Sequence, residues 1–196
     1  MEKRLTLKDG TNVFIRDLVP EDLDRLMEFY QALPEEDRRF LQIDVTKRDV
    51  VKKRIELMMA GLLIRIVALE DKKNSIIADG ALELPSKDWR RNQAEMRVIV
   101  ARPFQRMGLG MLMMKELTQI AHDHKVELLV VKMMRPQIAA RKICRKLGFR
   151  KKHVIHDYVV DMYGKTHGLL VMTQNVHDMW EELNHLYDDS DWQRCR

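Results

Sequence analysis

The sequence predicts an α/β domain. Three observations lead to this fold class: runs of Val, Ile and Leu are bounded by turn residues, long stretches show apolar residues at helical spacing, and the two patterns alternate along the chain. The length of 196 residues fits one domain, which we place at residues 1–196, with a core large enough to need no disulfide support.

The first half of the chain is expected to form a hairpin, three helices and an antiparallel meander. Asp9-Gly10 is a hairpin turn signal, and acidic residues after Pro34 suit the positive end of a helix dipole. The predicted strands are Arg4–Leu7, Asn12–Arg16, Leu62–Glu70, Ser75–Leu84 and Gln93–Ala101; the predicted helices are Glu21–Leu33, Pro34–Leu41 and a helix capped by Asp44 or Thr46 that ends near Met59.

The second half of the chain changes to longer helical patterns. Gly148 directly follows one of them and is typical of a helix C-terminal cap. In order, we expect a helix at Gly108–His124, a strand at Glu127–Lys132, a helix at Pro136–Leu147, strands at Val154–Val160 and Leu169–Met172, and a C-terminal amphipathic helix over residues 175–188.

Composition excludes several classes of protein. Lys and Arg number 35 against 30 Asp and Glu, a mild excess, and we expect these charges to be interspersed, without the basic and aromatic stripe of a nucleic-acid binder. Two cysteines are too few for a disulfide framework or a four-cysteine zinc site. The seven histidines show no spacing that brings three ligands together, so we expect no metal.

The location of the protein is predicted from what the sequence lacks. Its apolar runs are too short to span a bilayer, so no membrane partner is expected. The opening residues, Met1 to Gly10, contain no apolar signal core, and we therefore expect a reducing, cytoplasmic location.

The segment from Val98 to Gly110 is the most informative part of the sequence. A strand leaves through Gln105-Arg106-Met107-Gly108-Leu109-Gly110 and enters a long helix, whose first N–H groups lack partners. Glycines at such a turn let a ligand approach the backbone, which predicts a cradle for a phosphate or pyrophosphate, with Arg106, and a second arginine at Arg102, as positive groups.

Two common phosphate-binding motifs do not fit. The triphosphate loop that would end at Gly164-Lys165-Thr166 has Val159 where its first glycine is required. The dinucleotide fingerprint has Met113 where Gly or Ala is required.

Gln-x-x-Gly-x-Gly at a strand-to-helix turn resembles the pyrophosphate loop of the GNAT superfamily of acyl-coenzyme A N-acyltransferases. The segment from Gln137 to Phe149, with its Leu-Gly-Phe ending, is similar to a later helix of that family, and the element order agrees from about Leu5 to Met172. The resemblance implies a GNAT fold, with a mixed, mostly antiparallel sheet and helices on both faces. It also implies an acetyl-CoA cosubstrate and direct transfer to an amine, without an acyl-enzyme.

The resemblance also implies roles for individual residues. Residues of the turn would hold the pyrophosphate, the preceding strand would offer backbone groups to the pantetheine arm, and Gln137 stands where the family usually has asparagine. The coenzyme-binding residues expected on this basis are Val98, Ile99, Val100, Gln105, Arg106, Met107, Gly108, Leu109, Gly110 and Gln137.

A closer resemblance concerns the acceptor. The segments Asp17–Asp24 and Leu33–Phe40, and Ala94-Glu95, are similar to the GNAT domain of bacterial protein lysine acetyltransferases. Because a lysine amine has a pKa of about 10.4, a base must remove a proton before attack. The resemblance implies that this base is Glu95, which stands where those lysine acetyltransferases have a catalytic glutamate. We expect partial burial to raise the pKa of Glu95.

The general acid is less well defined. Many GNAT proteins have a tyrosine where this chain has Cys144, so Cys144 is the candidate donor to the leaving thiolate, although a free cysteine on a helix more often fills a core. Tyr158, Tyr163 and water are the other candidate donors.

The acceptor remains open between a protein lysine, as first choice, and a small amine or polyamine. A non-catalytic acyl-CoA sensor is the alternative from another class of function. A homodimer is possible through Trp180, Leu183 and Leu186 of the last helix, although packing of that helix on its own sheet is the preferred interpretation.

Overall fold

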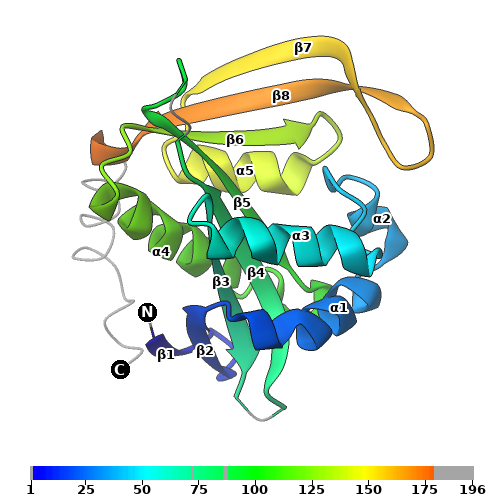
Figure 1. Ribbon diagram of the computed structural model, residues 1–196. Coiled ribbons are helices and arrows are strands. Elements are labelled where there is room, and N and C mark those ends of the chain that lie inside the picture. Colours follow the sequence, from blue (N-terminus) through cyan, green and yellow to red (C-terminus); the bar gives the residue numbers. More distant parts are fainter. Residues whose placement is uncertain (1, 72, 86–87, 179–196) are drawn as a thin grey trace.

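A computed structural model describes residues 2–71, 73–85 and 88–178 of the chain. Its centre is an eight-stranded sheet with the strand order β1-β2-β3-β4-β5-β6-β8-β7 (Figure 1). Neighbouring strands are antiparallel throughout, except that β5 and β6 run parallel. The predicted mixed, mostly antiparallel sheet is therefore confirmed.

The strands and helices follow the predicted order. The strands are β1 (Glu2–Thr6), β2 (Asn12–Asp17), β3 (Leu63–Glu70), β4 (Ser75–Glu83), β5 (Gln93–Val100), β6 (Leu128–Met134), β7 (Lys151–Val160) and β8 (Thr166–Asn175). The helices are α1 (Leu23–Ala32), α2 (Glu35–Arg38), α3 (Arg48–Met59), α4 (Leu109–Asp123) and α5 (Ile138–Lys146), with short 3₁₀ turns at Pro20–Asp22 and Arg102–Phe104.

Several predicted boundaries differ from the structure. The last two strands are longer than predicted: β7 begins at Lys151 rather than Val154, and β8 spans Thr166–Asn175 rather than Leu169–Met172. Helix α2 ends at Arg38 rather than near Leu41. The predicted cap of α3 is wrong: Lys47 occupies the cap position, because the Asp44 carboxylate instead accepts hydrogen bonds from the backbone and hydroxyl of Thr46. Asn175 ends strand β8, and its side-chain oxygen then accepts the N–H groups of His177 and Asp178, as an N-cap does.

The predicted C-terminal helix lies mostly outside the described residues. That includes Trp180, Leu183 and Leu186, on which the predicted dimer face depends, so this expectation stays a prediction.

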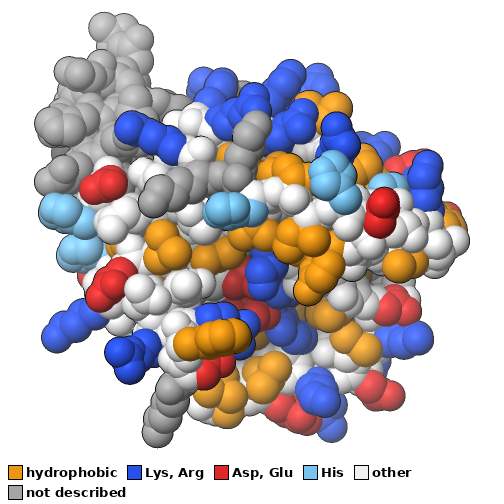
Figure 2. Space-filling view, turned by 90° about the horizontal axis from the view of Figure 1, so that it is seen from above, with side chains coloured by type: hydrophobic (Ala, Val, Ile, Leu, Met, Phe, Trp, Pro, Cys, Tyr) orange, Lys and Arg blue, Asp and Glu red, His pale blue; other side chains and the backbone are white. Residues whose placement is uncertain are grey.

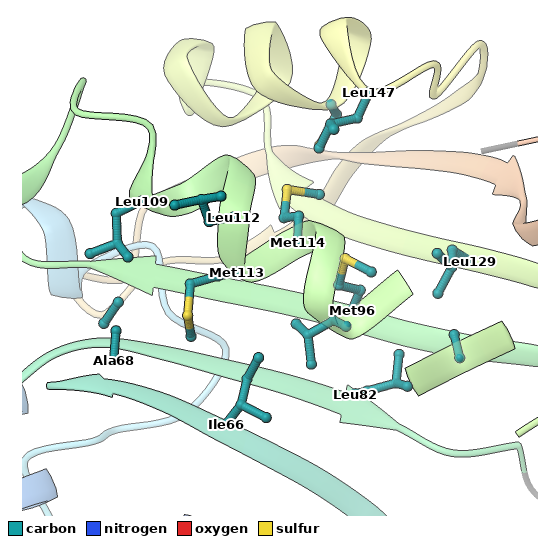
Figure 3. Close-up of a cluster of buried hydrophobic side chains, with 14 of the residues drawn as sticks. Ile66, Ala68, Leu82, Met96, Leu109, Leu112, Met113, Met114, Leu129 and Leu147 are labelled. Carbon is teal, nitrogen blue, oxygen red and sulfur yellow. The ribbon is translucent and has the colours of Figure 1, made fainter. Parts of the chain in front are cut away.

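One face of the sheet is covered by α4, around the larger of two hydrophobic clusters (Figure 3). The helix buries Leu109, Met113 and Leu117 completely, at the helical spacing that predicted it. Gly80 on β4 lets this helix approach closely, since a Cβ there would lie 3.2 Å from both Met113 and Leu117.

The opposite face carries α1 and α3 around a second cluster. Leu26 and Tyr30 of α1 and Val51 of α3 pack against Val67 and Leu69 of β3. The sheet therefore has helices on both faces, as expected (Figure 1).

The sheet is open in its middle. Strand β5 pairs with β6 only at Gln93↔Leu128, Ala94↔Leu129 and Glu95↔Val130. Beyond Glu95, β5 stays paired with β4 up to Val100, while β6 stays paired with β8 up to Met134. The two halves of the sheet therefore diverge on the carboxyl side of Glu95 (Figure 1).

The α4 cluster should dominate stability. We expect Leu117→Ala to lower the free energy of unfolding by about 2–5 kcal/mol, because the leucine is fully buried and its removal leaves a cavity. The matched change Leu62→Ala, at an exposed leucine, should cost less than about 0.5 kcal/mol. Urea denaturation measures both, and equal losses would contradict this assignment of the core.

Candidate active site

The turn between β5 and α4 presents unpartnered backbone N–H groups. Gly108, the residue before the helix, has φ of 90°, a left-handed conformation that glycine adopts without strain, and it makes no side-chain cap. The N–H groups of Leu109, Gly110 and Met111 make no hydrogen bond with another residue in the described part of the chain. They point out of the first turn of a fifteen-residue helix, where the dipole favours an anion.

Gly110 leaves room beside these groups. A Cβ at this position would meet only Val100, at an ordinary contact distance of 3.6 Å. The chain itself therefore does not require glycine here, and the missing side chain leaves space over the helix N-terminus. This is the observation that fits a diphosphate approaching the backbone.

The polar side chains of the turn have separate tasks. Gln105 donates from Nε2 to the carbonyl of Val100 at 3.0 Å and so ties the turn to the end of β5. Arg102 pairs with Asp37 and Glu36 of α2, so it is already engaged by carboxylates. Arg106 is exposed, has φ of 65°, and makes no ion pair with a described residue, which leaves it as the cation of the turn.

Val98, Ile99 and Val100 lie on β5 beside the opening of the sheet. Val98 and Val100 pack toward the α4 cluster, and Ile99 packs toward the α1 and α3 cluster. Their backbone edge on the β6 side has no strand partner, because the β5–β6 ladder ends at Glu95. Backbone donors and acceptors are thus available along the gap, apart from the Val100 carbonyl, which accepts from Gln105.

Glu95 marks the point where the gap begins. Its Oε1 accepts hydrogen bonds from Arg97 Nη2 at 2.9 Å and from Gln42 Nε2 at 3.0 Å, and its Oε2 lies 2.7 Å from Lys132 Nζ on β6. The side chain is mostly buried, with 12% of its surface exposed.

The expected rise in the pKa of Glu95 is wrong. Burial does act to raise the pKa, but the hydrogen bond from Lys132, the charge of Arg97 and the hydrogen bond from Gln42 outweigh it and hold the pKa below its ordinary value. The carboxylate is therefore ionised at neutral pH. Arg97 lies on the same strand, whereas Gln42 and Lys132 reach Glu95 from a loop and from the neighbouring strand β6, so no local pattern shows them.

Charged side chains continue from Glu95 across the α1 and α3 side of the sheet. Glu83 on β4 lies directly opposite Glu95, and Arg97 bridges the two carboxylates, at 3.0 Å from Glu83. Arg54 of α3 approaches the same Glu83 oxygen at 2.5 Å. Two carboxylates at one register position repel each other, and these arginines offset the repulsion.

A second charged group is fully buried beside the first. Arg65 Nη2 lies 2.7 Å from Asp79 Oδ2, and the hydroxyl of Tyr30 donates to the same oxygen at 2.7 Å. Burial, with the Asp79 charge beside it, raises the pKa of the Tyr30 hydroxyl, which therefore stays protonated. Sequence reasoning missed this group, although a charged residue inside each of the apolar β3 and β4 runs was a visible signal.

These charged groups line a cavity of about 50 Å³ between the sheet, α1, α3 and the loop before α3. Tyr30, Arg54, Arg65, Asp79 and Arg97 line it together with apolar side chains such as Val45 and Ile99. In the space-filling view, a hollow has acidic and basic side chains at its floor and hydrophobic side chains around it (Figure 2).

The turn between β7 and β8 forms hydrogen bonds with α2 and with the residues that follow it. Asp161 accepts from Arg39 Nη2 at 2.6 Å and lies 2.8 Å from His167 Nε2. The hydrogen bonds from Arg39 and His167 hold the pKa of Asp161 well below its usual range. Tyr163 donates to Glu35, so a tyrosine considered as a proton donor is engaged in this contact.

Comparison with known families decides the assignment. Residues 12–150 match the family model described as an acetyltransferase (GNAT) domain. The chain belongs to the GNAT family. Members of this family are acyl-CoA-dependent N-acetyltransferases, and this chain is one of them. No curated protein matches the sequence.

Solved structures share this GNAT fold at low sequence identity. Ribosomal-protein-S5-alanine acetyltransferase from Vibrio fischeri has a TM-score of 0.74 and 11% identity, and covers 85% of this chain and 94% of its own. RimJ from Mycobacterium smegmatis, in complex with CoA-disulfide, has a TM-score of 0.73 and 12% identity over 94% of this chain and 93% of its own. The GNAT domain of PAT from S. lividans has a TM-score of 0.70 and 14% identity over 89% and 96%.

Two residues that the resemblance assigned to the GNAT site have structural contacts in this chain. Cys144 on α5 is 2% exposed within the α4 cluster, and burial raises the pKa of its thiol to about 12. Gln137 accepts the backbone N–H of Met134 at 2.7 Å and so fixes the end of β6 to the start of α5. Both functional assignments stay predictions, and burial favours a packing role for Cys144.

Within the described residues, no group of three His, Cys, Asp or Glu side chains would hold a metal ion. The same part of the chain contains no helix that is long and apolar enough to cross a membrane.

The pKa of Glu95 should depend on its contact with Lys132. Replacing Lys132 with Met removes a hydrogen bond and a charge from the carboxylate, so the pKa of Glu95 should rise toward or above its ordinary value. A ¹³C NMR titration of the Glu95 carboxyl carbon measures this shift. The control Lys53→Met, on the exposed side of α3, should leave the titration unchanged, and an unchanged Lys132→Met titration would contradict the contact.

Proposed function

We propose that this GNAT domain transfers an acetyl group from acetyl-CoA to an amine of a protein, with a lysine side chain as the first candidate. The observation that supports it most is the opening of the sheet after Glu95, directly beside the unpartnered N–H groups of α4. A coenzyme held by its diphosphate at that helix would have its thioester arm along the unpaired edge of β5.

The coenzyme would be held mainly by backbone. The N–H groups of Leu109, Gly110 and Met111 would bind the diphosphate, Gly110 would admit it, and Arg106 would add a positive charge. When bound, acetyl-CoA supplies an activated acyl group, and the backbone groups of β5 that face the gap would align its arm.

Glu95 is the residue we assign to the acceptor amine. An ammonium group with a pKa of about 10.4 must lose a proton before it can attack. The ionised Glu95 carboxylate would accept a hydrogen bond from that ammonium and take its proton. Because its pKa is lowered by Lys132 and Arg97, we expect it to pass this proton on to solvent rapidly.

Water is the proton donor to the leaving thiolate that fits best. The buried Cys144 thiol has a pKa raised to about 12 and packs inside the core. Tyr163 is bound to Glu35, and Tyr158 is exposed on the edge strand β7. A thiolate reaching solvent through the gap between β5 and β6 needs none of these side chains.

A second candidate acceptor is the α-amine of a protein N-terminus. It is favoured by the names of the structural neighbours from Vibrio fischeri and Brucella melitensis, both of which are ribosomal-protein-alanine acetyltransferases. The chemistry at Glu95 is the same for both amines, but the N-terminal amine would lose its proton more easily because its pKa is about 8.

Coenzyme binding should depend on Arg106. We expect Arg106→Glu to raise the dissociation constant of coenzyme A about tenfold or more, because it replaces a cation beside the diphosphate with an anion. Isothermal titration calorimetry measures this. Arg91→Glu, which makes the same charge change at an exposed position before β5, should leave the constant within about twofold. Equal effects of the two variants would refute the diphosphate site.

Turnover should depend on Glu95. We expect Glu95→Gln to lower kcat by about 10²–10⁴-fold, because the amide cannot accept the proton, while coenzyme A affinity is unchanged. The activity that remains should rise with pH as more acceptor amine loses its proton unaided. Thiol release from acetyl-CoA gives kcat, and a wild-type rate in the variant would remove Glu95 from the mechanism.

Three acceptors separate the possible substrates: an N-acetylated peptide with one lysine, a lysine-free peptide with a free N-terminus, and spermidine. Fastest thiol release with the lysine peptide supports the proposal. Preference for the free N-terminus supports the second candidate, and preference for spermidine indicates a small-amine enzyme. Coenzyme binding without thiol release on any acceptor would overturn the enzymatic proposal in favour of a sensor.

A further inference from the structure

The positive charge of this protein is concentrated in one segment. Residues 135–156 contain eight Lys and Arg and no Asp or Glu, whereas the rest of the chain has 27 basic and 30 acidic residues. The expectation of interspersed charge is therefore wrong for this segment. It begins directly after β6 and comprises helix α5 and the first half of β7.

Five cations of this segment differ in their partners from the arginines on the α1 and α3 side of the sheet. Arginines on the other side of the sheet, such as Arg54, Arg65 and Arg97, are paired with carboxylates. By contrast, no ion pair to any described residue is made by Arg135, Arg141, Lys142, Arg145 or Lys146. Figure 2 shows Lys and Arg side chains gathered along one margin of the face seen from above.

A groove lies within this basic surface. Its volume is about 210 Å³, and Arg135, Arg141 and His156 line it together with Val154 and Leu170. A lining that combines basic and apolar side chains suits a ligand that combines carboxylates with aliphatic side chains.

The apolar residues around the groove favour a peptide over a nucleic acid. Ile138 on α5 and Val154 and Ile155 on β7 expose between 42% and 52% of their surface. These side chains are aliphatic and provide poor platforms for stacking bases. Strand β7 is also an edge of the sheet, paired within the described chain only with β8, and an extended peptide can add to such an edge through its backbone.

We propose that α5, the groove and the edge of β7 form a docking surface for an acidic, extended segment of the protein acceptor. The surface is adjacent to the proposed active site: Arg135 directly follows β6, whose Lys132 contacts Glu95. A segment bound there would hold its own protein close to the gap. The inference rests on the proposed function in one respect: the partner protein that carries the acidic segment is taken to be the acetyl acceptor.

The binding test needs no catalysis. The probe is a fluorescein-labelled peptide of alternating Glu and Val, compared by anisotropy with a twelve-nucleotide polyuridylate of the same label. We expect the peptide to bind more tightly than the RNA, and Lys142→Glu with Arg145→Glu to weaken it about tenfold or more. Lys52→Glu with Lys53→Glu, the same charge change on the exposed side of α3, should change binding by less than about twofold.

A kinetic test links docking to transfer. With a lysine acceptor fused to the Glu–Val segment, the α5 variant should raise KM and leave kcat unchanged, whereas with the untagged acceptor neither should change. Calorimetry with coenzyme A should give the same dissociation constant in the α5 variant and the wild type. If no acceptor is acetylated but the α5 variant still binds the peptide more weakly than the wild type, the proposed function fails and the docking surface stands.

Three results would overturn the docking surface. They are tighter binding of polyuridylate than of the peptide, equal losses in the α3 and α5 variants, and a loss of coenzyme A affinity in the α5 variant. The last would assign the basic residues to the phosphates of the coenzyme.

Discussion

The structure depends on the short parallel ladder between β5 and β6. These two strands share only the register from Gln93 to Glu95, and then each follows its other neighbour. The Glu95–Lys132 ion pair joins them at the last shared position. A longer ladder would close the gap and pair the backbone groups of residues 98–100, and without any ladder the two halves of the sheet would separate.

The two faces of the sheet serve different purposes. The α4 side is an apolar core in which Met113 and Leu117 pack against β4 at Gly80, and this packing fixes the helix whose N-terminus faces the gap. The α1 and α3 side contains a network of carboxylates and arginines that is satisfied largely within itself. Such a network is costly to desolvate, so its presence beside the gap fits a site for polar chemistry better than a role in stability.

The pairing of charged side chains also differs between the two parts of the molecule. On the α1 and α3 side, each arginine of the network has a carboxylate at hydrogen-bond distance. On α5 the cations project away from the core, and Cys144 is the helix's one fully buried residue. A protein that neutralises its cations in one place and leaves them uncompensated in another has a surface suited to an anionic partner.

The sequence by itself determined the element order and the glycine-containing turn before α4, because both depend on local patterns: apolar periodicity, Asp9-Gly10, and glycines at the start of a helix. It also located Glu95 on the strand that leads to the turn. Only the tertiary structure decided the state of that carboxylate, since Gln42 and Lys132 come from distant segments and, together with Arg97 on the same strand, outweigh the effect of burial. The tertiary structure likewise decided the roles of two other residues. Asp44 accepts a hydrogen bond from Thr46 instead of capping α3, and Cys144 is buried in the core. Long-range contacts set pKa values, partners and burial, and no local pattern records them.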